Sequence, residues 1–211
     1  GGPGSRAYEE KATDVAWLAC AIAWLDVDVL AVQEFKASAR AQRGTGTGPR
    51  LMRLLVTGGG GFLGSAICRL LRARGDEVVS LTRGHYPQLE WLGVRQVAGD
   101  IAGLDTVLLA SKGCDAVIHT AAKAGAWGAL EDYYQANVAG TDHVIAACFM
   151  NGIGRLVHTS TPSVVHDGRD LEGVDERVPL ATRFTAHYPR TKAIAEQRVR
   201  QANGPDLATV A

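Results

Sequence analysis

The sequence predicts an α/β protein built on a doubly wound parallel β-sheet, and three observations lead to this fold class. Short apolar runs typical of buried strands alternate with helical segments from residue 53 to the end of the chain. The first run leads through a glycine-rich turn into a helix. Of the 211 residues, 46% are hydrophobic and 21% are charged, which suits one medium-sized core. Such alternation implies right-handed crossovers, with helices on both faces of the sheet.

The elements follow one another in a regular order. Helices are expected over Phe62–Arg74, Leu104–Ala110 and Asp132–Met150, and Gly75 stands after the first helix, where a left-handed cap is needed. The last strand looks cut short, so we expect a C-terminally truncated sheet domain. The expected strands are Arg53–Thr57, Glu77–Thr82, Val94–Ala98, Ala116–Thr120, Leu156–Ser160 and Asp206–Ala211.

Residues 1–50 are expected to form an appendage to the sheet domain, residues 51–211. The appendage is predicted to hold a helix over Tyr8–Leu25 and a strand over Val27–Phe35. The alternating glycines of residues 44–49 predict a flexible linker, because such a run holds neither regular element. We interpret residues 1–50 as a fused or mispredicted remnant and Met52 as the natural start of the sheet domain.

Composition excludes several classes of partner. The 22 Lys and Arg residues balance 22 Asp and Glu residues, so the net charge creates no positive electrostatic potential that would attract a nucleic acid. The four cysteines are widely spaced and form no cluster with histidine, so neither a disulfide framework nor a metal site is expected. The longest apolar run, Val15–Leu25, is too short to span a bilayer. We therefore expect a cytoplasmic protein with a small-molecule ligand.

The turn between the first strand and the first helix is a candidate site for the pyrophosphate of a dinucleotide. Gly58 and Gly61 leave room for an anion at the helix N-terminus, and Gly64 lets the helix pack close to the strand. Arg83 follows the second strand, where a carboxylate would otherwise bind a ribose 2′-hydroxyl, and its guanidinium can pair with a 2′-phosphate. NADP(H) is therefore favoured over NAD(H). The alternatives are a glycine-rich turn without a ligand and an Arg83 that is only a surface charge.

Tyr188 and Lys192 are candidate catalytic residues, because the spacing i, i+4 places them one turn apart on the same helix face. A free phenol loses its proton only near pH 10, so it needs a nearby cation to exchange protons at neutral pH. Ser160 and Thr161 follow the fifth strand, at the carboxyl edge where ligands of parallel sheets bind. We expect Thr161, with Ser160 in reserve, to hold a substrate carbonyl.

Other polar and aromatic residues have two interpretations. Asp100 could accept a hydrogen bond from the adenine amino group or cap the segment that begins at Ile101. Asn137, inside an apolar helix, fits either close packing or a polar relay. Packing or surface positions are expected for His119, His143, His158 and His166, and core or pocket-wall positions for Trp91 and Trp127.

Together these motifs resemble the extended short-chain dehydrogenase/reductases over Met52–Ala211. Ala121–Gly128 and Thr159–Val164 are similar to the 3β-hydroxysteroid dehydrogenase-like branch of that family. The motifs that carry the family resemblance are Thr57-Gly58-x-x-Gly61-x-x-Gly64, Asp100-Ile101, His119–Ala122, Asn137–Thr141, Thr159–Thr161 and Tyr188-x-x-x-Lys192.

The resemblance implies a Rossmann-type fold, a homodimer and an NAD(P)-dependent oxidoreductase. The expected reaction is hydride transfer from NADPH to the 3-keto group of a hydrophobic substrate, above all a 2-alkyl-3-oxoalkanoic acid on the route to long-chain olefins. Tyr188 would be the general acid, Lys192 would hold the nicotinamide ribose and stabilise the phenolate, and Thr161 would orient the substrate oxygen. The residues expected to contact the cofactor are Gly58, Gly61, Phe62, Leu63, Gly64, Arg83, Asp100, Ile101, Ala121, Ala122 and Lys192.

The sequence departs from the family in two places. Extended members continue beyond the sixth strand into a substrate-binding lobe, so most of that lobe is expected to be missing. Asp26–Glu34 faintly resembles the strand that bears the metal-binding Glu of endonuclease/exonuclease/phosphatase enzymes, but the other motifs of that family are not found. Glu34 alone cannot assemble a magnesium phosphodiesterase site.

Three other functions stay open at this point. The first is a 3β-hydroxysteroid dehydrogenase. The second is a nucleotide-sugar epimerase or dehydratase that keeps NAD tightly bound, against which Arg83 argues. The third is a non-catalytic dinucleotide-binding module.

Overall fold

The computed structural model describes residues 51–125, 127–168 and 177–211. All of them except Leu51 belong to one unit, Met52–Ala211. The helix expected over Tyr8–Leu25, the strand expected over Val27–Phe35 and the linker lie outside the described residues.

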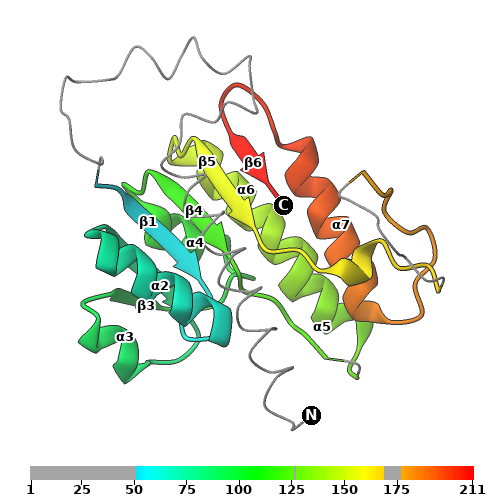
Figure 1. Ribbon diagram of the computed structural model, residues 1–211, viewed down its shortest axis with the longest axis horizontal. Coiled ribbons are helices and arrows are strands. Elements are labelled where there is room, and N and C mark those ends of the chain that lie inside the picture. The colour runs from blue at the N-terminus through cyan, green and yellow to red at the C-terminus, as the bar shows by residue number, and fades with distance from the viewer. Residues whose placement is uncertain (1–50, 126, 169–176) are drawn as a thin grey trace, which may run out of the picture. The chain divides into compact units, whose positions relative to one another are not determined.

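Six parallel strands form a single sheet in the order β3-β2-β1-β4-β5-β6 (Figure 1). From β1 in the middle of the sheet, the chain moves outward to β3, then returns past β1 to build β4, β5 and β6. This reversal confirms the predicted doubly wound sheet, and it leaves a switch point between β1 and β4. The strands are β1 (Arg53–Thr57), β2 (Glu77–Thr82), β3 (Arg95–Ala98), β4 (Ala116–His119), β5 (Arg155–His158) and β6 (Ala208–Val210).

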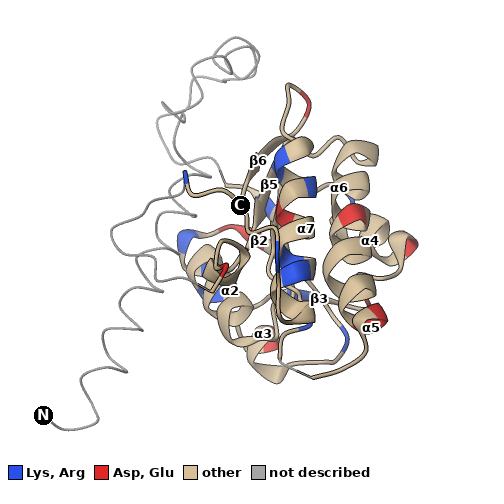
Figure 2. Ribbon diagram, turned by 90° about the vertical axis from the view of Figure 1, so that its right-hand side faces the viewer, with Lys and Arg blue, Asp and Glu red and all other residues tan. Residues whose placement is uncertain are grey.

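Helices cover both faces of the sheet, because right-handed crossovers change face when the chain reverses direction. α2 packs against β1 and β2, and α3 packs against β3, whereas α4, α6 and α7 lie side by side (Figure 2). The helices are α2 (Phe62–Arg74), α3 (Pro87–Trp91), α4 (Leu104–Ser111), α5 (Leu130–Tyr134), α6 (Gly140–Met150) and α7 (His187–Gln201).

The helix expected over Asp132–Met150 is interrupted. A π-helical turn, η2 (Gln135–Ala139), separates α5 from α6. Within it, the carboxamide of Asn137 accepts a hydrogen bond from Lys123 N at 2.7 Å and donates one to Lys123 O at 3.0 Å. This pairing with a neighbouring loop satisfies a buried amide, and apolar periodicity alone does not predict it.

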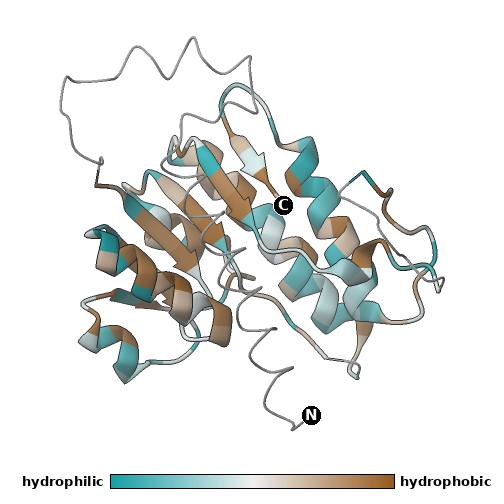
Figure 3. Cartoon of the chain, in the orientation of Figure 1, coloured by the Kyte–Doolittle hydropathy of each residue, from teal (hydrophilic) through white to brown (hydrophobic). Residues whose placement is uncertain are grey.

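The core lies on both sides of the central strands, whose middle residues are apolar (Figure 3). Leu54, Leu55 and Val56 of β1 are fully buried, as expected when helices cover both faces of a parallel sheet. A cluster of buried residues joins β1, β2, β4 and β5 to α4, α6 and α7.

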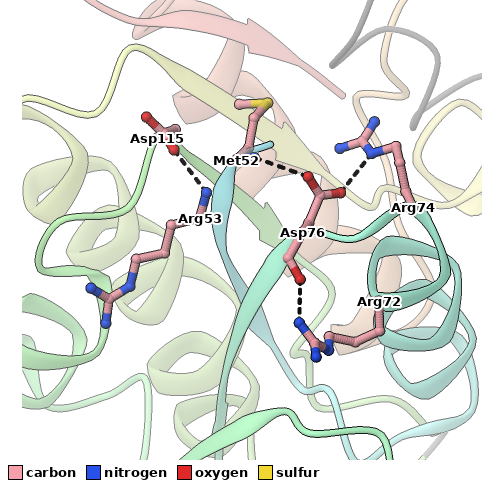
Figure 4. Close-up of polar contacts among 6 residues, drawn as sticks. All are labelled: Met52, Arg53, Arg72, Arg74, Asp76 and Asp115. Atoms are coloured by element: carbon pink, nitrogen blue, oxygen red, sulfur yellow. Dashed lines mark hydrogen bonds and ion pairs between the residues drawn. The ribbon is translucent and has the colours of Figure 1, made fainter. Parts of the chain in front are cut away.

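Two carboxylates fix the start of β1 (Figure 4). Asp76 is fully buried, and its side chain accepts hydrogen bonds from Met52 N at 3.0 Å and from Arg74 Nε at 2.5 Å. Asp115 accepts a hydrogen bond from Arg53 N at 2.7 Å. The N–H groups of both residues at the start of β1 are therefore paired by side chains.

His119 ends β4 in the middle of a buried chain of hydrogen bonds. Its Nδ1 lies 2.6 Å from Thr57 Oγ1, and its Nε2 lies 3.1 Å from Thr141 Oγ1. Since Thr141 Oγ1 donates to Asn137 O at 2.7 Å, Thr141 must accept from His119 Nε2–H. Burial lowers the pKa of His119, so the ring is neutral and Nδ1 accepts from Thr57, whose Oγ1 accepts from Ala121 N at 3.2 Å. The neutral imidazole thus couples β1, β4 and α6.

We expect the Asp76→Ala substitution to destabilise the protein by about 2–3 kcal/mol, because it leaves the buried Met52 N–H without an acceptor. The free energy of unfolding, measured by denaturant titration at neutral pH, checks this. Glu77→Ala is the control, since Glu77 forms an exposed ion pair with Arg53 and its loss should cost under about 1 kcal/mol. Equal losses in the two variants would contradict the assignment.

Acid should destabilise the protein through His119. Burial, together with the positive charge of Lys192, lowers the pKa of His119 from 6.5 to about 3. Below about pH 6.5 the unfolded chain binds a proton at His119, whereas the folded chain binds it only near pH 3. Stability is therefore lost as the pH falls through this window, by up to about 1.4 kcal/mol per pH unit. Unfolding free energies of wild type and His119→Asn should converge on acidification; parallel curves would exclude this role.

Candidate active site

A cavity of about 730 Å³ opens at the carboxyl edge of the sheet, at the switch point. Its walls come from the segments that follow four successive strands of the sheet: β3, β2, β1 and β4. Its volume falls within the range of roughly 300–1,000 Å³ of small-molecule sites. Among the lining residues are Gly58, Gly61, Thr82, Arg83, Tyr86, Gly99, Asp100, Ile101, Thr120, Ala121, Ala122 and Lys123.

The glycine-rich turn fits the pyrophosphate of a dinucleotide. Gly58 has a positive φ of 74°, and a Cβ on Gly64 would lie 2.2 Å from Gly58 O, so helix and turn can approach only with glycine there. Gly61 caps α2 without a side-chain hydrogen bond, and the first turn of α2 holds no acidic residue. The first N–H groups of the helix are thus left for an anion.

Most of the residues expected to contact a cofactor line this cavity, but four do not. Phe62 is 76% exposed and Leu63 is partly exposed, and neither lines the cavity. Gly64 lies behind the turn, against Gly58. Lys192 is 2% exposed and lies at the end of β5.

Asp100 and Arg83 both line the cavity, Asp100 in the turn after β3 and Arg83 in the segment after β2. Asp100 Oδ1 accepts a hydrogen bond from Ala102 N at 2.9 Å. Of the two roles expected for Asp100, the carboxylate thus has that of a cap for the segment that begins at Ile101. Arg83 is exposed where β2 ends, and nearby Thr82 Oγ1 donates to Gly84 O at 2.8 Å.

Tyr86 is a cavity residue that sequence reasoning missed. A Cβ on Gly60 would lie 2.3 Å from its ring, so the tyrosine packs directly on the glycine-rich turn. The Gln96 carboxamide holds the Tyr86 backbone, accepting from Tyr86 N at 2.8 Å and donating to Tyr86 O at 3.1 Å. No sequence motif predicts this contact, because only the fold brings together the glycine-rich turn, the segment of Tyr86 and β3.

Lys192 is buried at the carboxyl end of β5. Its Nζ donates to Thr159 O at 2.6 Å and lies 3.0 Å from His158 Nε2. Burial lowers the pKa of Lys192 from 10.5 to about 8, against an opposing effect of Glu196. Since α7 connects β5 to the parallel strand β6, it runs back from the carboxyl edge. Tyr188, one turn before Lys192 and half-buried, therefore lies nearer that edge.

Three hydroxyl side chains follow β5: Ser160 and Thr161 have partners, whereas Thr159 Oγ1 is buried with no hydrogen-bond partner among the described residues. Ser160 Oγ donates to Glu196 Oε2 at 2.5 Å, which ties the end of β5 to α7. Thr161 caps the short 3₁₀ helix η3 (Pro162–Val164), where its Oγ1 accepts from Ser163 N at 3.4 Å. The structure thus gathers these hydroxyls and Lys192 on neighbouring segments. No hydrogen bond joins the Tyr188 hydroxyl to Lys192, Ser160 or Thr161, all of which are described.

The other sequence interpretations have mixed outcomes. Asn137 Nδ2 donates to Thr191 Oγ1 at 3.0 Å, so its buried amide links η2 to the residue before Lys192. Trp91 and Trp127 are 85% and 92% exposed, so the core position expected for them is wrong, and neither lines the described cavity. Among the described residues there is no cluster of His, Cys, Asp and Glu suited to a metal ion, and no helix long and apolar enough to cross a membrane.

Comparison with known proteins gives relatives along most of the chain. The chain is 57% identical over 162 residues to a 2-alkyl-3-oxoalkanoate reductase of Stenotrophomonas maltophilia, covering 76% of this chain and 49% of the relative. It is 47% identical to the enzyme of the same name from Shewanella oneidensis, covering 73% of this chain and 40% of that one. The chain thus spans about half the length of these relatives or less.

Solved structures show the same fold. A short-chain dehydrogenase/reductase superfamily protein from Agrobacterium tumefaciens, determined with bound NAD, superimposes with a TM-score of 0.66 and 28% identity. The match covers 75% of this chain and 47% of that protein. Residues 55–211 match the model of the 3-beta hydroxysteroid dehydrogenase/isomerase family, in agreement with the motifs at the cavity. The chain therefore belongs to the 3-beta hydroxysteroid dehydrogenase/isomerase family.

Proposed function

We propose that this chain is the dinucleotide-binding and catalytic part of an NADPH-dependent reductase that acts on a 3-keto group. The observation that carries the proposal is the buried Lys192, fixed at the carboxyl end of β5 one helical turn from Tyr188. The carboxyl edge at which Lys192 lies also holds the cavity lined by Gly58 and Gly61. A cation beside a phenol near a dinucleotide site is suited to proton transfer to a carbonyl oxygen.

A bound nicotinamide would supply the hydride. The phenol of Tyr188 would give its proton to the carbonyl oxygen, and the charge of Lys192 would stabilise the phenolate left behind. Thr161, at the end of β5, is our candidate for orienting that oxygen, with Ser160 as the reserve. Ser160 Oγ donates to the Glu196 carboxylate at 2.5 Å, whereas the contacts of Thr161 Oγ1 with Ser163 are longer, at 3.3 and 3.4 Å, which favours Thr161 for this role.

The substrate we propose is a 2-alkyl-3-oxoalkanoic acid, reduced to the 2-alkyl-3-hydroxy acid. Two relatives, at 57% and 47% identity, carry the name 2-alkyl-3-oxoalkanoate reductase, whereas a relative named 3-beta-hydroxysteroid dehydrogenase, from Mycolicibacterium neoaurum, is 38% identical. This ranking favours the keto acid over a steroid. A homodimer and a cytoplasmic location stay predictions from the sequence.

NADPH is the proposed cofactor, because Arg83 lines the cavity where β2 ends. The Agrobacterium relative was determined with NAD, so the class of cofactor agrees, and Arg83 is the argument for the phosphorylated form. Preference for tightly bound NAD would instead favour an epimerase.

Tyr188→Phe should lower kcat by roughly 10²–10⁴-fold while NADPH binding is kept, because only the transferable proton is removed. Oxidation of NADPH in the presence of a 2-alkyl-3-oxoalkanoic acid measures this. Tyr134→Phe is the control, since Tyr134 is exposed on α5. Turnover at the wild-type rate in Tyr188→Phe would reject the mechanism, and a wild-type chain that binds NADPH without turnover would support a non-catalytic module.

Arg83→Ser should weaken NADPH binding by roughly 10–100-fold and leave NADH binding unchanged, because a charge-assisted contact to the 2′-phosphate is lost. Calorimetric titration with both nucleotides measures the two dissociation constants. Arg69→Ser, which removes an exposed charge from α2, should change neither. A similar loss for both nucleotides would show that Arg83 does not read the 2′-phosphate.

A further inference from the structure

His158 is a second buried histidine, and its ring faces Lys192. It is 1% exposed at the end of β5, and its Nε2 lies 3.0 Å from Lys192 Nζ. Its ring centroid lies 5.2 Å from that of His119, on the neighbouring strand β4. Both nitrogens of His119 are engaged by threonine hydroxyls. Among the described residues, the hydrogen-bond partner of the His158 ring is Lys192.

The contact with Lys192 determines which ring nitrogen of His158 carries the proton. An ammonium group has three N–H donors and no acceptor, so His158 Nε2 must accept from Lys192 and the ring proton must lie on Nδ1. Nδ1 is buried and has no hydrogen-bond partner among the described residues. A buried donor without a partner costs stability, and an apolar side chain on β5 would avoid that cost. What the histidine contributes is its Nε2 acceptor.

The groups that surround the Lys192 ammonium leave its charge largely unneutralised. Its two hydrogen-bond acceptors, His158 Nε2 and Thr159 O, are both neutral. Glu196, on the same helix, is the carboxylate that acts on it, but Glu196 accepts from Ser160 and lies 3.8 Å from Arg200. Burial and the charge of Lys192 lower the pKa of His158 well below 6.5, so the histidine brings no second charge.

We propose that His158 is a positioning residue for Lys192: as a neutral, Nδ1-protonated imidazole, it holds the ammonium at the end of β5 without neutralising it. This inference rests on the proposed function, because the charge held there is the one that would stabilise the phenolate of Tyr188. A carboxylate in the place of His158 would hold Nζ equally well but would cancel the charge.

The tautomer can be tested without any turnover. In the ¹⁵N spectrum of histidine-labelled protein, the resonances missing from His158→Gln identify His158. They should show a neutral ring protonated at Nδ1 that does not titrate between about pH 5 and 8. Lys192→Met should shift the Nε2 resonance, because its donor is gone. A ring protonated at Nε2, or a titration near pH 6.5, would overturn the proposal whatever the enzymatic activity.

The pH dependence of turnover gives the second readout. His158→Leu removes the acceptor, which favours the neutral amine. The basic limb of the kcat profile, expected near pH 8 from Lys192, should then move by roughly one pH unit to lower pH. His158→Gln keeps an acceptor within reach of Nζ and should restore the wild-type limb. His166→Gln, an exposed position, is the control.

An unshifted limb in a folded His158→Leu protein, or the same shift in His158→Gln, would reject the positioning role. If His158→Leu does not fold, the ¹⁵N tautomer and the His158→Gln profile decide. If the wild type binds NADPH but does not turn over, the proposed function fails while the ¹⁵N spectrum still decides the role of His158.

Discussion

A buried cation whose two hydrogen-bond acceptors are both neutral is the constraint around which the carboxyl end of β5 is built. The Lys192 ammonium is withdrawn from water and stabilised by a carbonyl and an imidazole, both neutral. Burial of a charge is costly, and such a site keeps its charge only where acceptors are placed in advance. The ends of β4 and β5, the π-helical turn and α7 all contribute to that placement, through His119, Asn137 and Thr191.

The order of the strands determines which segments meet at the dinucleotide site. Because β1 lies between β2 and β4, the glycine-rich turn after β1 comes beside the segments that follow its two neighbours. Those segments carry Arg83 and Ala121, which are 38 positions apart in sequence yet line one cavity. Two polar networks at opposite ends of β1 hold this arrangement: the Asp76 network at its start and the Thr57–His119 pair at its end.

Much of this could be read from the chain, because the signals are local. The apolar runs, the glycine turn and Gly75, whose φ is 99°, predicted the strands, the first helix and its end. The i, i+4 spacing of Tyr188 and Lys192 likewise predicted one face of one helix. The π-helical turn could not be read, since apolar periodicity continues through it and the pairing of its Asn137 with Lys123 appears only in the fold. Nor could the partner of Ser160, because Glu196 lies on another segment, α7.

The sequence by itself determined the class of fold, the order of its elements and the types of residue at the carboxyl edge, since periodicity, turn chemistry and spacing act within a few residues. Only the tertiary structure decided which of those residues share an environment. It buried His158 beside Lys192 and set Tyr86 on the glycine turn, whereas it left Trp91 and Trp127 in solvent. The physical reason is that burial and hydrogen-bond partners are properties of packed segments, and the packing joins positions far apart in the chain.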